Sequence, residues 1–116
     1  MVAMKRGENA ELAAMAGMLH DFYTYAKTDS KDHAHKGAPF SEEVLKCLGI
    51  ATDEETELIC NAIYNHSDKE AAGSPFDEVL KDADVLDHCL YNITQPVMPH
   101  EMERFEKLKI EFGLLQ

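Results

Sequence analysis

Residues 12–23 read Leu-Ala-Ala-Met-Ala-Gly-Met-Leu-His-Asp-Phe-Tyr, and this stretch decides the fold class. Its apolar residues recur at intervals of three and four along the chain. They are Leu12, Met15, Ala16, Leu19, Phe22 and Tyr23. This spacing places them on one face of a helix, which we expect to run from Glu8 to about Tyr25. The polar pair His20-Asp21 falls near the end of that helix.

Capping signals locate two further helices. Thr52 and Glu55 form a capping box, which predicts a helix that ends at about His66. The pair Ser74-Pro75 supplies a capping hydroxyl followed by a proline at the first helical position. A helix is therefore expected from there to about Leu90.

The rest of the chain contains shorter helical segments and no strand pattern. A short helix is expected over 40–48, with Gly49 closing it, and another over 100–112. The polar segment 27–38 reads as a loop. No stretch alternates with a period of two, so we predict an all-α fold. It is a single compact bundle of about five helices that spans residues 1–116.

Composition narrows the class of protein. The net charge of −11 argues against binding to duplex nucleic acid or to an anionic membrane, whose phosphates would repel the chain. No apolar run reaches the roughly 20 residues that span a bilayer. Three cysteines, Cys47, Cys60 and Cys89, stand far apart and form no CxxC pair. We expect them to be reduced, small and buried in a cytoplasmic protein.

Two acidic positions on predicted helices could bind a metal ion. The side chains of His20 and Asp21 point about 100° apart, so they can share an ion only if it sits between them at the helix surface. Asp84 follows Leu80 by one helical turn, beside the buried face, and an unpaired carboxylate there would be costly. A metal, Lys81 or a helix N-terminus would each satisfy it. The alternative for His20-Asp21 is a solvated helix end.

The remaining histidines allow more than one interpretation. His66 ends its helix and is followed by Ser67-Asp68-Lys69, a cluster that suits phosphate but also an ordinary polar turn. His88 lies one turn after Asp84 and is a candidate further ligand or partner of the ligands. His33 and His35 fall in the predicted loop, where surface histidines are common. Cys60 is six residues from His66, a spacing that does not favour a Cys–His nucleophile.

Four segments together resemble the HD superfamily of metal-dependent phosphohydrolases, in particular its small bacterial members. They follow the family's order over roughly residues 8–91. The segments are Ala14-Met15-Ala16-Gly17-Met18-Leu19-His20-Asp21, His33-Ala34-His35-Lys36-Gly37-Ala38, Ala62-Ile63-Tyr64-Asn65-His66-Ser67 and Lys81-Asp82-Ala83-Asp84-Val85-Leu86-Asp87.

The resemblance implies a role for each matching residue. His20, Asp21 and Asp84 correspond to metal ligands, for an ion that the sequence leaves open among Mn, Fe, Ni, Zn, Co and Mg. Asp21, His33 and His66 correspond to catalytic residues: Asp21 orients or deprotonates the attacking water, and the two histidines contact a second metal or the substrate phosphate. Lys69 is a further candidate for the phosphate. The resemblance implies that Asp82 lies behind the ligands rather than among them, and His35 has no clear counterpart in the family.

One family feature has no match in this chain. The first metal ligand of the family is a histidine on a preceding helix, and no histidine precedes His20 here. We therefore expect an N-terminally short member, with apolar surface that a homodimer would cover.

The expected activity is hydrolysis of a small phosphomonoester or nucleotide. Two alternatives remain: a degenerate HD-domain protein that binds metal or ligand without turnover, and a helical interaction module without metal.

Overall fold

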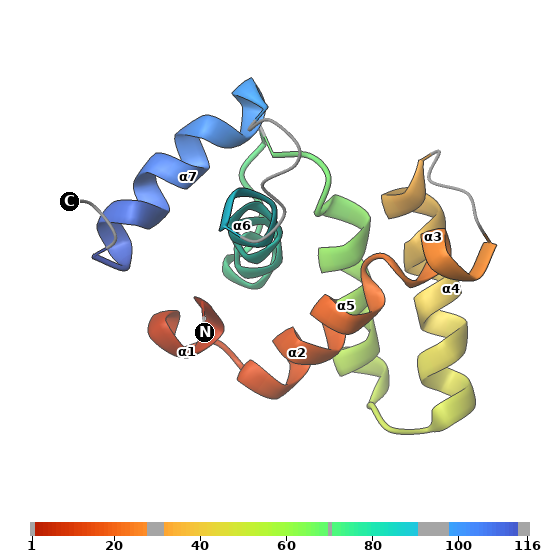
Figure 1. Cartoon of the computed structure of the whole chain (residues 1–116). Coiled ribbons are helices and arrows are strands. Elements are labelled where there is room, and N and C mark those ends of the chain that lie inside the picture. Colours follow the sequence, from red (N-terminus) through yellow and green to blue (C-terminus); the bar gives the residue numbers. More distant parts are fainter. Residues whose placement is uncertain (1, 28–31, 70, 91–97, 114–116) are drawn as a thin grey trace.

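The computed structural model describes residues 2–27, 32–69, 71–90 and 98–113 of the chain. Over these ranges it contains seven α-helices and no strand (Figure 1). The helices are α1 (Val2–Arg6), α2 (Ala10–Leu19), α3 (Phe22–Lys27), α4 (His33–Leu48), α5 (Asp53–Asn65), α6 (Pro75–Leu90) and α7 (Pro99–Glu111). The all-α prediction is confirmed.

The helix count and two boundaries differ from the prediction of about five helices. The predicted first helix is interrupted by a turn at His20-Asp21, so that α2 and α3 are separate, and α1 precedes both. The predicted loop over 27–38 was wrong in its second half, because α4 already begins at His33. Ala34, Gly37 and Ala38 are buried there, and packing overrides the weak helix propensity of the segment.

The predicted caps are confirmed. The Thr52 side chain accepts from the backbone of Glu55, whose carboxylate accepts from the Thr52 backbone in return. Gly49 ends α4 with a φ of 64°, a left-handed conformation that glycine adopts without strain. The Ser74 hydroxyl accepts from the backbone of Asp77 at 3.2 Å and caps α6.

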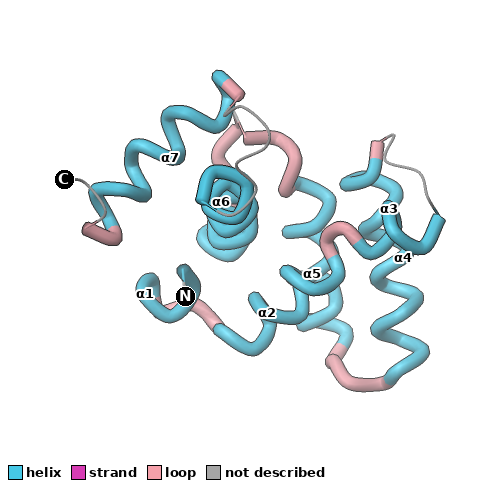
Figure 2. The backbone as a smooth tube through the Cα atoms, in the orientation of Figure 1, coloured by secondary structure: helices cyan, strands magenta, loops and turns pink. Residues whose placement is uncertain are grey.

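Helix α6 packs against α1, α2, α5 and α7, whereas α3 and α4 lie on the far side of α5 (Figures 1 and 2). One buried apolar cluster joins α2, α4, α5 and α6 through residues that include Ala16, Leu45, Ile63 and Leu80. A second cluster joins α1, α6 and α7 and includes Val2, Val85 and Leu108. Because α6 contributes to both clusters, side chains on its different faces reach both halves of the domain.

The cysteines depart from the expected burial. Cys47 is exposed, and Cys60 and Cys89 are partly buried. All three are free thiols, as expected. Cys47 lies in the last turn of α4, where that helix faces solvent, so the prediction of burial was wrong for it.

Across the described ranges, none of the helices combines the length and the apolar character that crossing a bilayer would require.

Candidate metal centre

Two turns bring the predicted site residues together. The first turn joins α2 to α3 and contains His20 and Asp21, and the second follows α5 and contains His66 (Figure 2). Helices α2 and α5 pack against each other, which places the two turns side by side. The rings of His20 and His66 meet edge to face, with centroids 5.1 Å apart.

His20 is the centre of the group. Its Nδ1 lies against the carbonyl oxygen of Gly17, one turn back in α2. A carbonyl only accepts, so Nδ1 carries the proton and Nε2 faces the carboxylates. Nε2 lies 3.2 Å from Oδ2 of Asp21 and 3.4 Å from Oδ1 of Asp84.

His66 is oriented in the same way as His20. Its Nδ1 lies 2.6 Å from the carbonyl oxygen of Ile63, which assigns the proton to Nδ1 and makes Nε2 the basic atom. Only 1% of His66 is exposed, and burial lowers its pKa to about 4. The ring is therefore neutral at pH 7, the form that binds a metal ion.

Asp84 extends the group from α6. Its Oδ1 faces His20, and its Oδ2 accepts a hydrogen bond from Nζ of Lys69 at 2.9 Å. Burial opposes ionisation of Asp84, but the bonds with His20 and Lys69 outweigh it and hold its pKa well below the usual range. The cation that pairs with Asp84 is thus Lys69, whereas Lys81 donates to the carbonyl of Ala71 instead.

The charges and distances of this group fit a divalent cation. Burial alone would lower the pKa of His20, but hydrogen bonds to Asp21 and Asp84 raise it to about 10. Lys69 balances one of the two carboxylates, that of Asp84, and a proton on His20 or a metal cation would balance the other. Ligand atoms about 2.0–2.2 Å from one ion lie roughly 3.0–3.5 Å from each other, as His20 does from both carboxylates. Ligand atoms of His20, Asp21 and His66 all lie within 4.8 Å of one another.

Two of the other histidines, His88 and His35, lie away from this group. His88 was wrong as a partner of Asp84, because its Nδ1 pairs with Glu101 of α7 at 2.8 Å. His35 stacks on the ring of Tyr64, with centroids 4.2 Å apart, and pairs with Asp32.

Asp82 and Cys60 are structural as well. Asp82 is two residues from Asp84 and so faces another side of α6, where its carboxylate binds Arg6 and Arg104. Burial raises the pKa of the Cys60 thiol to about 11, which leaves it protonated and a poor nucleophile at pH 7. The side chain of His33, predicted to contact phosphate or a second metal, lies outside the described part of the chain.

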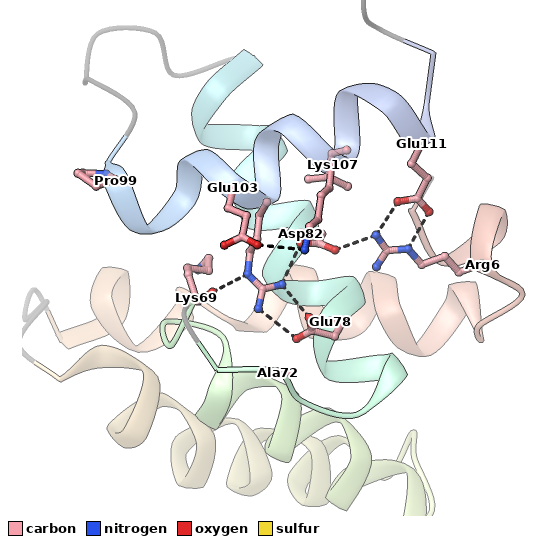
Figure 3. Close-up of a pocket in the computed structure, with 11 residues that line it drawn as sticks. Arg6, Lys69, Ala72, Glu78, Asp82, Pro99, Glu103, Lys107 and Glu111 are labelled. Atoms are coloured by element: carbon pink, nitrogen blue, oxygen red, sulfur yellow. Dashed lines mark hydrogen bonds and ion pairs between the residues drawn. The ribbon is translucent and has the colours of Figure 1, made fainter.

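A groove of about 570 Å³ lies beside α6 and α7, and its lining includes Lys69, Asp82 and Glu111 (Figure 3). Its charged side chains bind one another: Arg6 reaches Asp82 at 2.7 Å and Glu111 at 2.8 Å. These ion pairs join α1, α6 and α7 to one another. Because the charged groups of the groove are already paired, the groove is a weaker candidate for the reaction site than the group around His20.

The fold and the site together define an all-α domain with a His-Asp-His group suited to a divalent metal. The family model of the HD domain matches residues 1–89, and the chain belongs to that family. Membership places it in a superfamily of metal-dependent phosphohydrolases. No curated protein and no solved structure matches the chain significantly.

Proposed function

We propose that this protein is a metal-dependent phosphohydrolase that acts on a small phosphomonoester or nucleotide. The observation that carries the proposal is the convergence of His20, Asp21 and His66, whose ligand atoms lie within 4.8 Å of one another. Membership of the HD domain family supports the same reaction class.

We place His20, Asp21 and Asp84 among the metal ligands and add His66 to them. The low pKa of His66 makes it neutral at pH 7, so it suits a metal better than it suits an anionic phosphate. With His66, the site has two imidazoles and two carboxylates although no histidine precedes His20. Mixed nitrogen and oxygen ligands of this kind suit Mn²⁺, Fe²⁺, Co²⁺, Ni²⁺ or Zn²⁺, and Mg²⁺ less well.

A divalent ion supplies Lewis acidity, which polarises a phosphoryl oxygen and makes water a better nucleophile near neutral pH. The chain's own residues position the reactants. Asp21 is the most exposed of the four side chains at the site, with 42% of its side chain accessible. A carboxylate there orients a water molecule and accepts its proton. The water oxygen bonds to phosphorus, the ester P–O bond breaks, and the leaving alcohol or nucleoside takes up a proton.

The test measures metal binding and turnover on the same preparations. Protein stripped with a chelator is titrated with Mn²⁺, Ni²⁺, Co²⁺, Zn²⁺ and Mg²⁺, and phosphate release is followed over a panel of phosphomonoesters and nucleotides. We expect metal-dependent release by the wild type and none by Asp21→Ala. Asp87→Ala is the matched control, because Asp87 is an exposed carboxylate on α6, one turn after Asp84.

Each outcome separates the proposal from its alternatives. Metal binding without turnover on any member of the panel supports the degenerate HD-domain protein. No metal binding, together with no change of melting temperature on adding metal or chelator, supports the helical interaction module. Full metal occupancy in Asp21→Ala refutes the site assignment.

We also propose that the protein forms a homodimer. Met4 on α1 and Met18 on α2 are 74% and 80% exposed, and they are apolar side chains that a second copy of the chain would cover. Sedimentation of the wild type and of Met18→Gln tests the proposal, which predicts a dimer that the substitution weakens. A wild type that sediments as a monomer at high concentration contradicts it.

A further inference from the structure

Lys69 is a buried cation next to the proposed metal ligands. It lies in the segment between α5 and α6, three residues after His66, and only 5% of its side chain is exposed. Its Nζ donates to Oδ2 of Asp84 at 2.9 Å and to the carbonyl oxygen of His66. A buried ammonium is costly unless such partners satisfy it, so both bonds are part of the folded structure.

These two bonds hold two of the site residues at once. Lys69 holds one oxygen of Asp84, which leaves the other oxygen of that carboxylate turned toward Nε2 of His20 at 3.4 Å. The second bond restrains the backbone of His66, whose ring lies against His20. The ammonium is thus already bonded to two of the site residues, the carboxylate of Asp84 and the backbone of His66.

We propose that Lys69 is a positioning residue that orients Asp84 and His66 toward the metal ion, and that it does not bind the substrate phosphate. The proposal rests on the metal site of the proposed function. It differs from the role expected from the sequence, in which Lys69 neutralises phosphate charge.

Helix α7 holds Lys69 in this position. Nε of Arg104 donates to the backbone carbonyl of Lys69 at 2.8 Å, and Nη2 donates to that of Ala71 at 3.0 Å. Helix α7 lies beyond residues 1–89, the part matched by the family model. A helix outside the family match therefore helps to fix the segment that carries Lys69.

The sign of the change in metal affinity distinguishes positioning from simple electrostatics. Lys69→Met removes a positive charge near the site, which by itself would tighten the binding of a cation. Loss of positioning would instead weaken it, by about 10- to 100-fold where a residue that orients ligands is removed. We expect the full-length protein with Lys69→Met to bind Mn²⁺ more weakly by that factor and to show an altered Co²⁺ absorption spectrum.

A double-mutant cycle tests whether Lys69 acts through Asp84. Mn²⁺ affinity is measured for Lys69→Met, Asp84→Asn and the pair, with Lys107→Met as control because the Lys107 side chain is 75% exposed. Lys69→Met should have little further effect in the Asp84→Asn background. Unchanged or tighter binding by Lys69→Met refutes the positioning role. A rise in KM for substrate with unchanged metal affinity also refutes it, in favour of phosphate binding.

A measurement on the wild type covers the case in which Lys69→Met does not fold. In ¹⁵N-labelled protein, the Lys69 ammonium should exchange slowly with water and stay so when Zn²⁺ is added. Rapid exchange in the Zn²⁺-loaded protein would show that the bond to Asp84 is lost, which refutes the proposal. A wild type that binds no metal refutes the proposed function together with this inference, whereas metal binding insensitive to Lys69 refutes the inference alone.

Discussion

Arg104 gives the sharpest test of how α7 is joined to the rest of the domain. Its guanidinium makes five hydrogen bonds: two to backbone carbonyls of the segment after α5, two to Glu78 and one to Asp82. Only 12% of its side chain is exposed. Arg104→Met keeps much of the apolar stem and removes all five bonds.

The expected loss of stability in Arg104→Met depends on which hydrogen bonds the partners of Arg104 keep. Asp82 keeps its ion pair with Arg6, and Glu78 keeps the backbone amide of Gly73. Charged hydrogen bonds contribute about 1.5–3 kcal/mol each, but the loss is far from additive when the partners keep other donors. We expect Arg104→Met to lower the free energy of unfolding by about 2–3 kcal/mol. With an unfolding entropy near 2.1 cal/mol/K per residue, this corresponds to a fall in Tm of about 8–12 °C.

The assay is thermal and urea unfolding of the wild type, Arg104→Met and Arg104→Lys. Arg104→Lys keeps the charge but loses the planar fork, so we expect an intermediate loss. Lys107→Met is the matched control on the same helix, because Lys107 pairs only with the exposed Glu103 among the described contacts and should change stability by less than about 0.5 kcal/mol. An Arg104→Met protein that melts within about 2 °C of the wild type would refute the reasoning.

Three further predictions concern other parts of the fold. The pKa of His66 is about 4 in the folded chain, against an ordinary value of 6.5. As the pH falls, the His66 ring is therefore protonated in the unfolded chain before it is protonated in the folded chain. The contribution of His66 to stability should therefore be complete above pH 6.5, and stability should fall by up to about 3 kcal/mol between pH 6.5 and pH 4, measured by urea unfolding of chelator-treated protein, with His66→Asn flattening that slope. Gly37→Ala should stabilise α4 by about 0.5–1 kcal/mol, because the new methyl group meets Tyr23 at 3.6 Å, an ordinary contact. A loss of stability would contradict that packing. Thr52→Ala should cost about 1 kcal/mol in urea unfolding and Thr52→Ser much less, and equal losses would contradict the capping role.

The partners of Asp84 and His88 could not be predicted from the sequence. Spacing placed Asp84 beside a buried face, where a metal, Lys81 or a helix N-terminus would each satisfy its carboxylate. The structure supplies Lys69 from a segment 15 residues earlier. His88 likewise shares a face with Asp84 in the sequence, yet it pairs with Glu101. Periodicity assigns a residue to a face of a helix but does not say which other helix covers that face.

The sequence by itself determined the features that depend on neighbouring residues. Apolar periodicity determined the all-α class, capping residues determined the starts of α5 and α6, and Gly49 determined the end of α4. The family resemblance implied that His20, Asp21 and Asp84 bind one metal, but only the tertiary structure decided the contacts at the site, with His66 against His20 and Lys69 on Asp84. The physical reason is range: caps and periodicity act within a few residues, whereas the site depends on how helices distant in the chain pack on α6.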